Sequence, residues 1–188
     1  MKKKLKLFIF LIILLQSCAT FVNNSDANQK NDESNIDLFN GKYEVSSMEY
    51  QDKFDSYEYH NLFRELDRKI LKDTLELDIN NTYHINLNLI NNNRIKIDYL
   101  SNGYIFRSRI IKTKLKKDGY LYLKNKNVGF SLIPYLFGGL DVKRTRLSIN
   151  EDENLVVEVS HFQGGAALLI LFLDLGTEKY IKTYRRIY

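Results

Sequence analysis

The feature that most constrains the fold is an alternation of apolar and polar side chains with a period of two. It runs through three successive segments, 74–79, 83–89 and 94–99, in which every second residue is Leu, Ile or Tyr. Asparagine pairs separate these segments, and Ser101-Asn102-Gly103 follows the last one. Because successive side chains of a strand point to opposite faces, the pattern predicts half-buried antiparallel strands joined by tight turns.

Strands are also expected on both sides of this meander. A first strand covers 41–45, and later strands are expected over 104–115, 120–125, 128–133, 140–149, 155–161, 166–173 and 177–188. Ile110 and Ile111 are adjacent apolar residues, which indicates a β-bulge between them. The run 166–173 is entirely apolar but too short to span a membrane as a helix, so it predicts a strand buried on both faces. Segment 134–139 contains proline and two glycines and predicts a loop or a sheet edge.

One segment has a helical period instead. Within 55–71, apolar side chains recur at spacings of three and four, with charged residues, Glu65 among them, on the opposite face. Asp55 is a suitable N-cap, and Glu58 three residues later completes a capping-box pattern. We therefore expect one amphipathic helix after the first strand.

These elements together predict a mainly β domain. Many short antiparallel strands with one helix favour a meander of about eight to ten strands that closes into a barrel, because closure removes exposed sheet edges. A sandwich of two sheets is the alternative arrangement.

The N-terminus has the three parts of a secretory signal. Four lysines lie within the first six residues, nine apolar residues follow from Leu7 to Leu15, and a small residue, Ser17, precedes Cys18. An apolar run of this length is too short to cross a bilayer as a helix, and the arrangement is typical of a cleaved signal peptide.

The tetrad Leu15-Gln16-Ser17-Cys18 resembles a bacterial lipobox. The resemblance implies that diacylglycerol is attached to the Cys18 sulfur, that the chain is cleaved after Ser17, and that the new amino terminus is acylated. Residues 1–17 would then be the signal peptide. An ordinary secreted protein is the alternative. Because Ala19 follows the cysteine in place of an aspartate that retains some lipoproteins in the inner membrane, the expected location is the outer membrane.

Residues 18–37 are expected to be the lipidated cysteine and a flexible tether, and 38–188 the β domain. Between Asn23 and Asn35, Ala27 is the only apolar residue, so the segment has too little apolar surface to offset the entropy of ordering it. The chain has 28 basic and 23 acidic side chains, and loss of the four leader lysines would leave 24 against 23. This balance argues against a nucleic-acid partner. With Cys18 as the sole cysteine, no disulfide within the chain is expected.

Gly41-Lys42-Tyr43 at the start of the first strand, together with Arg185 or Arg186 near the last strand, resembles the lipocalin-like proteins. Tyr43 stands where that family has tryptophan. The resemblance implies a barrel with a cavity for a small, largely apolar ligand.

No catalytic or cofactor motif is present in the sequence. There is no Gly-x-Ser-x-Gly elbow and no phosphate-binding glycine loop, and the histidines at 60, 84 and 161 are far apart. We therefore expect neither an enzyme, nor a cofactor, nor a metal site. Arg107 and Arg109 on one strand, with Arg144 and Arg146 on another, are the candidate site for an anionic group, since guanidinium forks bind carboxylate or phosphate. The alternative for these arginines is a solvated outer face.

The expected function is non-enzymatic binding of a small, largely apolar ligand by a membrane-anchored lipoprotein of the cell envelope. This hypothesis predicts a cavity within the barrel. The alternative is a protein–protein interaction module, such as an inhibitor or an envelope-assembly partner, that acts through its outer surface. That hypothesis predicts a filled core and an exposed apolar or tyrosine-rich patch.

Overall fold

The computed structural model describes residues 21, 35–49, 61–66, 77–124, 127–133, 137–167 and 171–188, with side chains placed for all but 127–133, 137–141, 163–167 and 171–175. The predicted signal peptide, Cys18 and, apart from Phe21, the predicted tether up to residue 34 lie outside the described residues.

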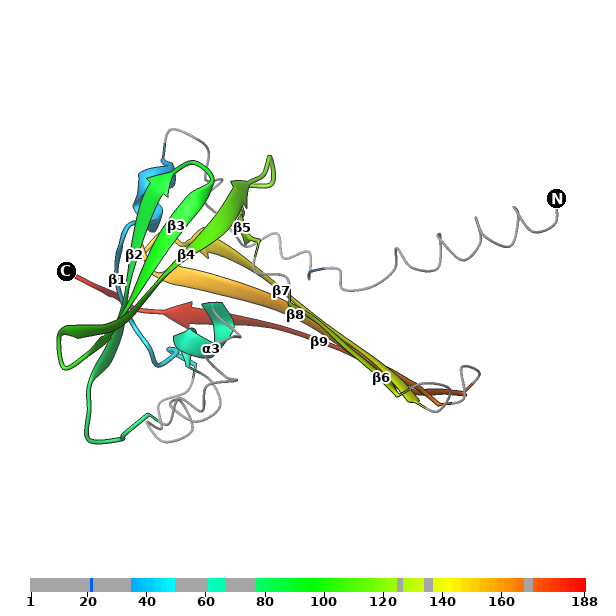
Figure 1. The fold of residues 1–188 in the computed structure, drawn as a ribbon. Coiled ribbons are helices and arrows are strands. Elements are labelled where there is room, and N and C mark those ends of the chain that lie inside the picture. The colour runs from blue at the N-terminus through cyan, green and yellow to red at the C-terminus, as the bar shows by residue number, and fades with distance from the viewer. Residues whose placement is uncertain are drawn as a thin grey trace.

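The described strands form one antiparallel sheet of ten strands (Figure 1). Their order is β10-β1-β2-β3-β4-β5-β7-β8-β9, and β6 pairs with β7 off this path. The strands are β1 (Gly41–Glu44), β2 (Tyr83–Asn91), β3 (Arg94–Ser101), β4 (Tyr104–Leu115), β5 (Leu121–Leu123), β6 (Asn127–Ile133), β7 (Phe137–Ile149), β8 (Leu155–Ala167), β9 (Leu171–Tyr184) and β10 (Arg186–Ile187). A 3-10 helix, η2 (Ile36–Phe39), precedes β1, and an α-helix, α3 (Leu62–Leu66), follows it. The prediction of a mainly β antiparallel meander is confirmed.

The period-two alternation gives the register of the first strands. Ile85 on β2 pairs with Tyr99 on β3, and Leu87 pairs with Ile97. All four side chains are fully buried, while the residues between them point to the opposite face. One apolar face per strand is sufficient to fix this pairing, because a slip by one residue would expose the whole buried set.

The predicted closure into a barrel is wrong. The strand path begins at β10 and ends at β9, and within the described part of the chain no ladder joins these two ends. β1 and β10 are short and share only two residue pairs, Lys42↔Ile187 and Tyr43↔Arg186. In contrast, β7 and β8 each have 13 residues and β9 has 14, so with β6 they continue past the other strands as a long arm (Figure 1). β10 follows β9 after Arg185 alone, and the β1–β10 ladder that the end of the chain forms is limited to these two residue pairs.

The predicted strand over 74–79 ends in a turn. The described residues of this segment begin at Leu77. The side-chain Oδ1 of Asp78 accepts hydrogen bonds from both the backbone N–H and the side-chain amide of Asn80, each at 2.9 Å. The backbone N–H of Asn81 also donates to the Asp78 carbonyl, at 3.0 Å. Such local bonds compete with pairing to a neighbouring strand. The chain therefore turns here and enters β2.

The irregularity in β4 lies nearer its start than predicted. The β3–β4 register shifts after Tyr99, which makes Phe106 the extra residue of the bulge. Ile110 is 60% exposed and Ile111 is 8% exposed, which is the alternation of a regular strand. The predicted bulge at these two residues is therefore wrong. The shift also moves Ile105 to the outer face of the sheet.

The apolar run 166–173 contains a chain reversal and is not one strand. β8 ends at Ala167, β9 begins at Leu171, and these two residues are cross-strand partners. Likewise β6 ends at Ile133 and β7 begins at Phe137, its partner, so the predicted loop at 134–139 is shorter than expected. Periodicity cannot locate a turn within a run that is apolar throughout.

Only part of the predicted helix 55–71 is described. α3 has five residues, and the side-chain Oδ1 of Asn61 accepts a hydrogen bond from the backbone N–H of Arg64 at 2.9 Å, which caps its start. Residues 51–60 and 67–76 lie outside the described residues, so the full helix and its Asp55 cap remain predictions. Glu65, expected on the polar face, is only 2% exposed.

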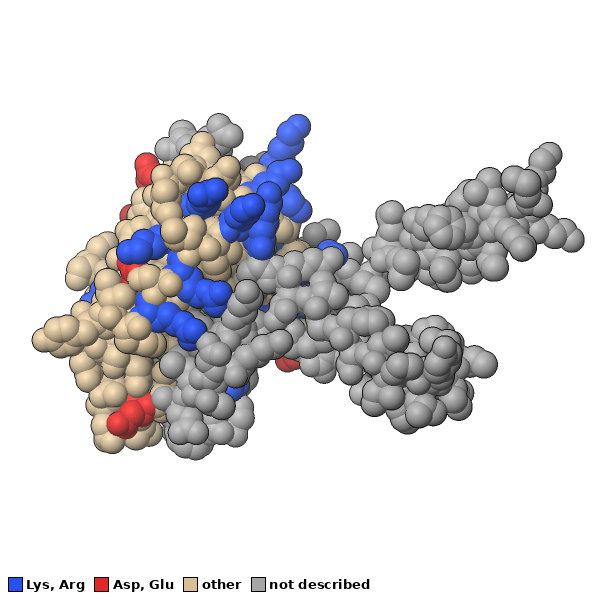
Figure 2. Space-filling view, viewed as in Figure 1, with Lys and Arg blue, Asp and Glu red and all other residues tan. Residues whose placement is uncertain are grey.

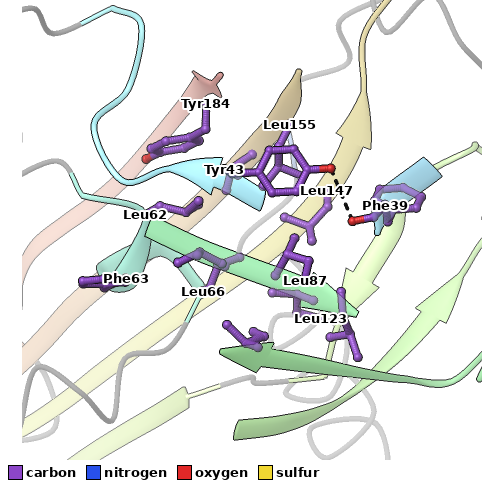
Figure 3. Packing of buried hydrophobic residues seen from close by; sticks show 14 of the residues in the cluster. Phe39, Tyr43, Leu62, Phe63, Leu66, Leu87, Leu123, Leu147, Leu155 and Tyr184 are labelled. Atoms are coloured by element: carbon purple, nitrogen blue, oxygen red, sulfur yellow. Dashed lines mark hydrogen bonds between the residues drawn. The ribbon is translucent and has the colours of Figure 1, made fainter. Parts of the chain in front are cut away.

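Side chains from the sheet, η2 and α3 meet in one apolar core (Figure 3). Leu62, Phe63 and Leu66 of α3 are fully buried. The largest fully buried side chains are Tyr43, Tyr99, Tyr184, Phe39, Phe63, Leu62, Leu66, Ile85, Leu87, Ile95 and Ile97. Among the described residues, no helix has the length and apolar character needed to cross a membrane.

Candidate binding surface and two buried charge clusters

The four predicted anion-binding arginines lie on opposite faces of the sheet. Arg107 is the cross-strand partner of the fully buried Tyr99, so Arg107 and Arg109 leave β4 on the inner face. Arg144 and Arg146 lie on β7, where they alternate with residues of the core and therefore leave on the outer face. β5 also separates β4 from β7. The structure thus does not bring the two pairs together, and binding of an anion by either pair remains a prediction.

Arg146 is the centre of a buried cluster on the outer face. Its guanidinium donates from Nε and Nη2 to Oε2 of Glu158, at 2.8 and 2.5 Å, and from Nη1 to the hydroxyl of Tyr122, at 3.2 Å. The guanidinium carbon also lies 3.7 Å from the ring centroid of Tyr120 and 4.5 Å from that of Phe21. Although Arg146 is only 5% exposed, its charge is therefore matched by a carboxylate and two ring faces.

Phe21 is attached to the domain through this cluster. Its ring packs edge-on against the ring of Tyr122, with 5.6 Å between centroids. On Tyr122 itself, Lys116 Nζ lies 3.5 Å from the ring centroid, and the hydroxyl donates to Asp118 at 2.6 Å. Phe21 is therefore docked on the sheet at this point, while the rest of the predicted tether up to residue 34 lies outside the described residues.

Glu65 is the centre of a second buried cluster, on the inner face. Lys143 Nζ donates to Oε2 at 2.6 Å, and Lys182 Nζ donates to Oε1 at 2.7 Å. The Tyr180 hydroxyl donates to Oε2 at 2.9 Å, and the Thr145 hydroxyl donates to the backbone carbonyl of Glu65 at 3.1 Å. These bonds fix α3 against β7 and β9.

The protonation states in this inner cluster follow from burial and charge. Burial alone would raise the pKa of Glu65, but the ammonium groups of Lys143 and Lys182 hold it below its usual value. Nearby Tyr184 has a pKa raised well above its usual value, because it is buried and because Glu65 is negatively charged. At neutral pH the cluster therefore contains an ionised carboxylate and a neutral phenol.

The residues that resemble the lipocalin-like motif come together at the start of β1. The guanidinium of Arg186 donates to the carbonyls of Leu38, at 3.3 Å, and Asn40, and lies 5.8 Å from the ring centroid of Tyr43. A Cβ on Gly41 would lie 3.0 Å from Arg186 Nε, so glycine leaves room for this guanidinium. Of the two arginines considered, Arg186 occupies this position.

Large apolar side chains are exposed on the N-terminal part of β4. Tyr104 is 80% exposed, Ile105 56%, Phe106 43% and Ile110 60%. We call these four residues the β4 patch. The inner side of Phe106 packs against the aromatic core, with ring centroids 6.0 Å from Phe63 and 6.4 Å from Tyr99. The patch therefore has a rigid aromatic anchor.

The surroundings of the β4 patch are basic. From Tyr104 to Lys117 the chain has six basic side chains and no acidic one. Asp98, across the sheet from this strand, is 3% exposed and its carboxylate lies 2.9 Å from Lys96 Nζ. Lys and Arg side chains gather over the part of the molecule where β4 lies (Figure 2). An apolar patch with a basic border is complementary to a partner of opposite charge.

Both buried clusters were missed from the sequence. The sequence predicted Glu65 on the polar face of a helix and assigned no partner to Lys143 or Lys182. One feature of the sequence could have indicated that these lysines face the core. Lys143 shares its strand face with the core residue Leu147, and Lys182 shares its strand face with the core residue Tyr184. Among the described residues, no group of three or more His, Cys, Asp or Glu side chains is arranged to hold a metal ion.

No family model, curated protein or solved structure matches this chain.

Proposed function

We propose that this protein is a lipid-anchored protein of the bacterial cell envelope whose β domain binds a partner protein through the β4 patch. The observation that carries the proposal is the exposure of Tyr104, Ile105, Phe106 and Ile110 on one basic strand. Single exposed apolar residues are ordinary on protein surfaces, whereas several together with a charged border are typical of interaction sites.

The interior of the domain supports surface binding over binding of a small apolar ligand. The space between the strands of the described part is occupied by core side chains, and α3 adds Leu62, Phe63 and Leu66 to it. Glu65 then fixes α3 in place with Lys143 and Lys182. A filled core with an exposed apolar patch is the combination expected of an interaction module.

The charge of β4 indicates the kind of partner. A second copy of this chain would place basic residues against basic residues, which is unfavourable. We therefore propose a different protein, with an apolar surface bordered by Asp and Glu. Phe106 would be a central contact, because its ring is already held by core aromatic side chains and loses little freedom on binding.

The test is site-specific photo-crosslinking in the native cells, with the full chain and Cys18 intact. A photoreactive phenylalanine at the half-buried Leu100, the cross-strand partner of Ile105, is expected to give one adduct of defined mass, and the same residue at the exposed Glu151 is not. Changing Ile105→Asp together with Ile110→Asp is expected to weaken capture about 30-fold, the effect of losing one strong interface contact. The matched control Met48→Asp alters another exposed apolar side chain, 44% exposed, and should leave the adduct unchanged.

Native mass spectrometry of the same membrane-extracted protein tests the competing function. The expected mass is that of the acylated polypeptide with no further bound molecule. A small molecule that co-purifies with the protein and is lost on denaturation would contradict the proposal and favour ligand binding.

A further inference from the structure

We infer that the outer face around the β4–β5 hairpin lies against the anionic phospholipid headgroups of the membrane, beside the lipid anchor. The inference rests on the lipid anchoring at Cys18 in the proposed function. It adds which side of the domain faces the bilayer.

The position of Phe21 carries the first step. Phe21 contacts Tyr122 on β5 and the guanidinium of Arg146 on β7. It is three positions from Cys18, and an extended chain spans about 3.3–3.6 Å per residue. An acylated Cys18 must therefore be within about 10 Å of the Phe21 backbone. The domain is thus held close to the bilayer, with this part of the outer face nearest to it.

The charge of this surface carries the second step. Lys114, Tyr122 and Arg146 are successive cross-strand partners, so they lie side by side on the outer face. Exposed lysines surround the place where Phe21 docks: Lys112, Lys114, Lys116, Lys117 and Lys124. The acidic residue of this hairpin, Asp118, accepts a hydrogen bond from the hydroxyl of Tyr122.

These two features together identify the occupant as a bilayer. Clustered lysines next to an acyl anchor are attracted to anionic headgroups, and a lipid anchor combined with a basic surface holds a domain in one orientation. Tyr104 lies at the other end of the same strand. Tyr104 and Lys117 are 13 positions apart, about 40 Å along an extended chain. The Tyr104 end of the β4 patch is therefore farther from the membrane than the hairpin is, whereas Ile110 lies next to the basic surface.

The experiment uses the full chain, processed in cells and reconstituted into phosphatidylglycerol vesicles that contain a headgroup spin label. Acylation blocks the Cys18 thiol, so Lys117→Cys or Tyr104→Cys introduces a single reactive thiol for a fluorophore. We expect strong quenching of the label at 117 and little at 104. Equal quenching at the two positions, or stronger quenching at 104, would overturn the inference.

Charge variants test whether the lysines bind the headgroups or the label at 117 is only held near the bilayer by the anchor. In the protein labelled at 117, Lys112→Gln with Lys114→Gln should reduce quenching to the level seen in phosphatidylcholine vesicles. The matched control, Lys179→Gln with Arg185→Gln, removes two exposed charges elsewhere and should leave quenching unchanged. Raising salt from 0.1 to 1 M, which shortens the Debye length from about 10 to about 3 Å, should act like the first pair. Equal loss in both pairs would contradict a local basic site.

The role of Phe21 is tested in the same assay. Phe21→Ala should lower quenching at 117, because the anchor is no longer held beside the hairpin, whereas Tyr188→Ala removes an exposed aromatic side chain and should have no effect. The mass of the N-terminal peptide separates this inference from the proposed function. An unmodified Cys18 would refute the lipid anchor and with it the inference, while an acylated Cys18 with an unquenched label at 117 would refute the inference alone.

Discussion

The two buried charge clusters differ in what they connect. Glu65 bonds to Lys143 and Lys182, which are 78 and 117 positions away in the chain. Arg146 bonds to Glu158, only 12 positions away, across one hairpin of the sheet. The inner cluster is therefore a tertiary connection that fixes α3. The outer cluster instead forms on strands that are already paired, and its ring faces provide the surface on which Phe21 docks.

The two clusters should therefore respond differently to substitution. Removing one partner of a buried ion pair leaves the other charge without compensation, and the penalty is greatest where water cannot enter. Glu65 has a single carboxylate between two ammonium groups, whereas Arg146 also has aromatic rings around it. We expect the inner cluster to be the more sensitive of the two.

The largest effect is expected from Glu65→Gln. The substitution leaves Lys143 and Lys182 facing a neutral amide and should lower the free energy of unfolding by about 3–5 kcal/mol. Chemical denaturation of the full chain measures this. The double variant Glu65→Gln with Lys182→Met should recover part of the loss, because it removes one uncompensated charge, and a purely additive result would contradict the coupling between the two residues.

Acid should affect the inner cluster through the same carboxylate. The folded-state pKa of Glu65 lies below its usual value of 4.5, so its contribution to stability is complete above pH 4.5 and is lost as the pH falls through the folded-state pKa. Unfolding free energies measured from pH 6 downward should therefore fall more steeply for the natural protein than for Glu65→Gln. Parallel curves for the two proteins would show that Glu65 is not responsible.

A smaller effect is expected from Arg146→Lys in the outer cluster. Lysine keeps the charge but cannot form the two bonds to Glu158 Oε2 or stack on the rings. The free energy of unfolding should therefore fall by about 1–3 kcal/mol. The same denaturation measurement applies. A loss as large as that of Glu65→Gln would contradict this expectation, because it would mean that the outer cluster contributes as much to stability as the inner cluster does.

The smallest effect on stability is expected from Phe21→Ala. A cation–π contact and one edge-on ring pair at the half-buried Phe21 contribute about 1–2 kcal/mol, and the strands below them are already paired. The substitution should change the thermal midpoint by no more than a few degrees, while it alters the orientation on vesicles. A large drop in the midpoint would assign Phe21 to the core of the fold.

The sequence predicted the strands well where one face is apolar and failed where both faces are. From Tyr83 to Tyr99 the alternation gives both the strands and their register. The run 166–173 has no polar face, so nothing in it marks the reversal between Ala167 and Leu171. Barrel closure failed for a different reason, since it depends on the tilt and stagger of the strands around the whole sheet rather than on any local pattern.

The candidate sites likewise depend on features that no local pattern contains. Arg107 and Arg109 were predicted on one face of a strand and leave it on the inner face. Their distance from Arg144 depends on strand order, which the sequence does not give. The clusters around Glu65 and Arg146 depend on contacts between segments that are distant in the chain. The sequence shows which residues are charged, but it does not show which of them are paired.

The position of Arg186 has a consequence for the order of folding. It donates to the Leu38 carbonyl, 148 positions earlier in the chain, and lies over the ring of Tyr43. The start of β1 therefore packs against a segment near the C-terminal end of the chain, which the ribosome synthesises after all the other described strands. Contacts of such long sequence separation slow folding, because a large loop must close before they form. A nascent chain can pair β2 with β3 early, but β1 remains incomplete until its C-terminal partner has emerged.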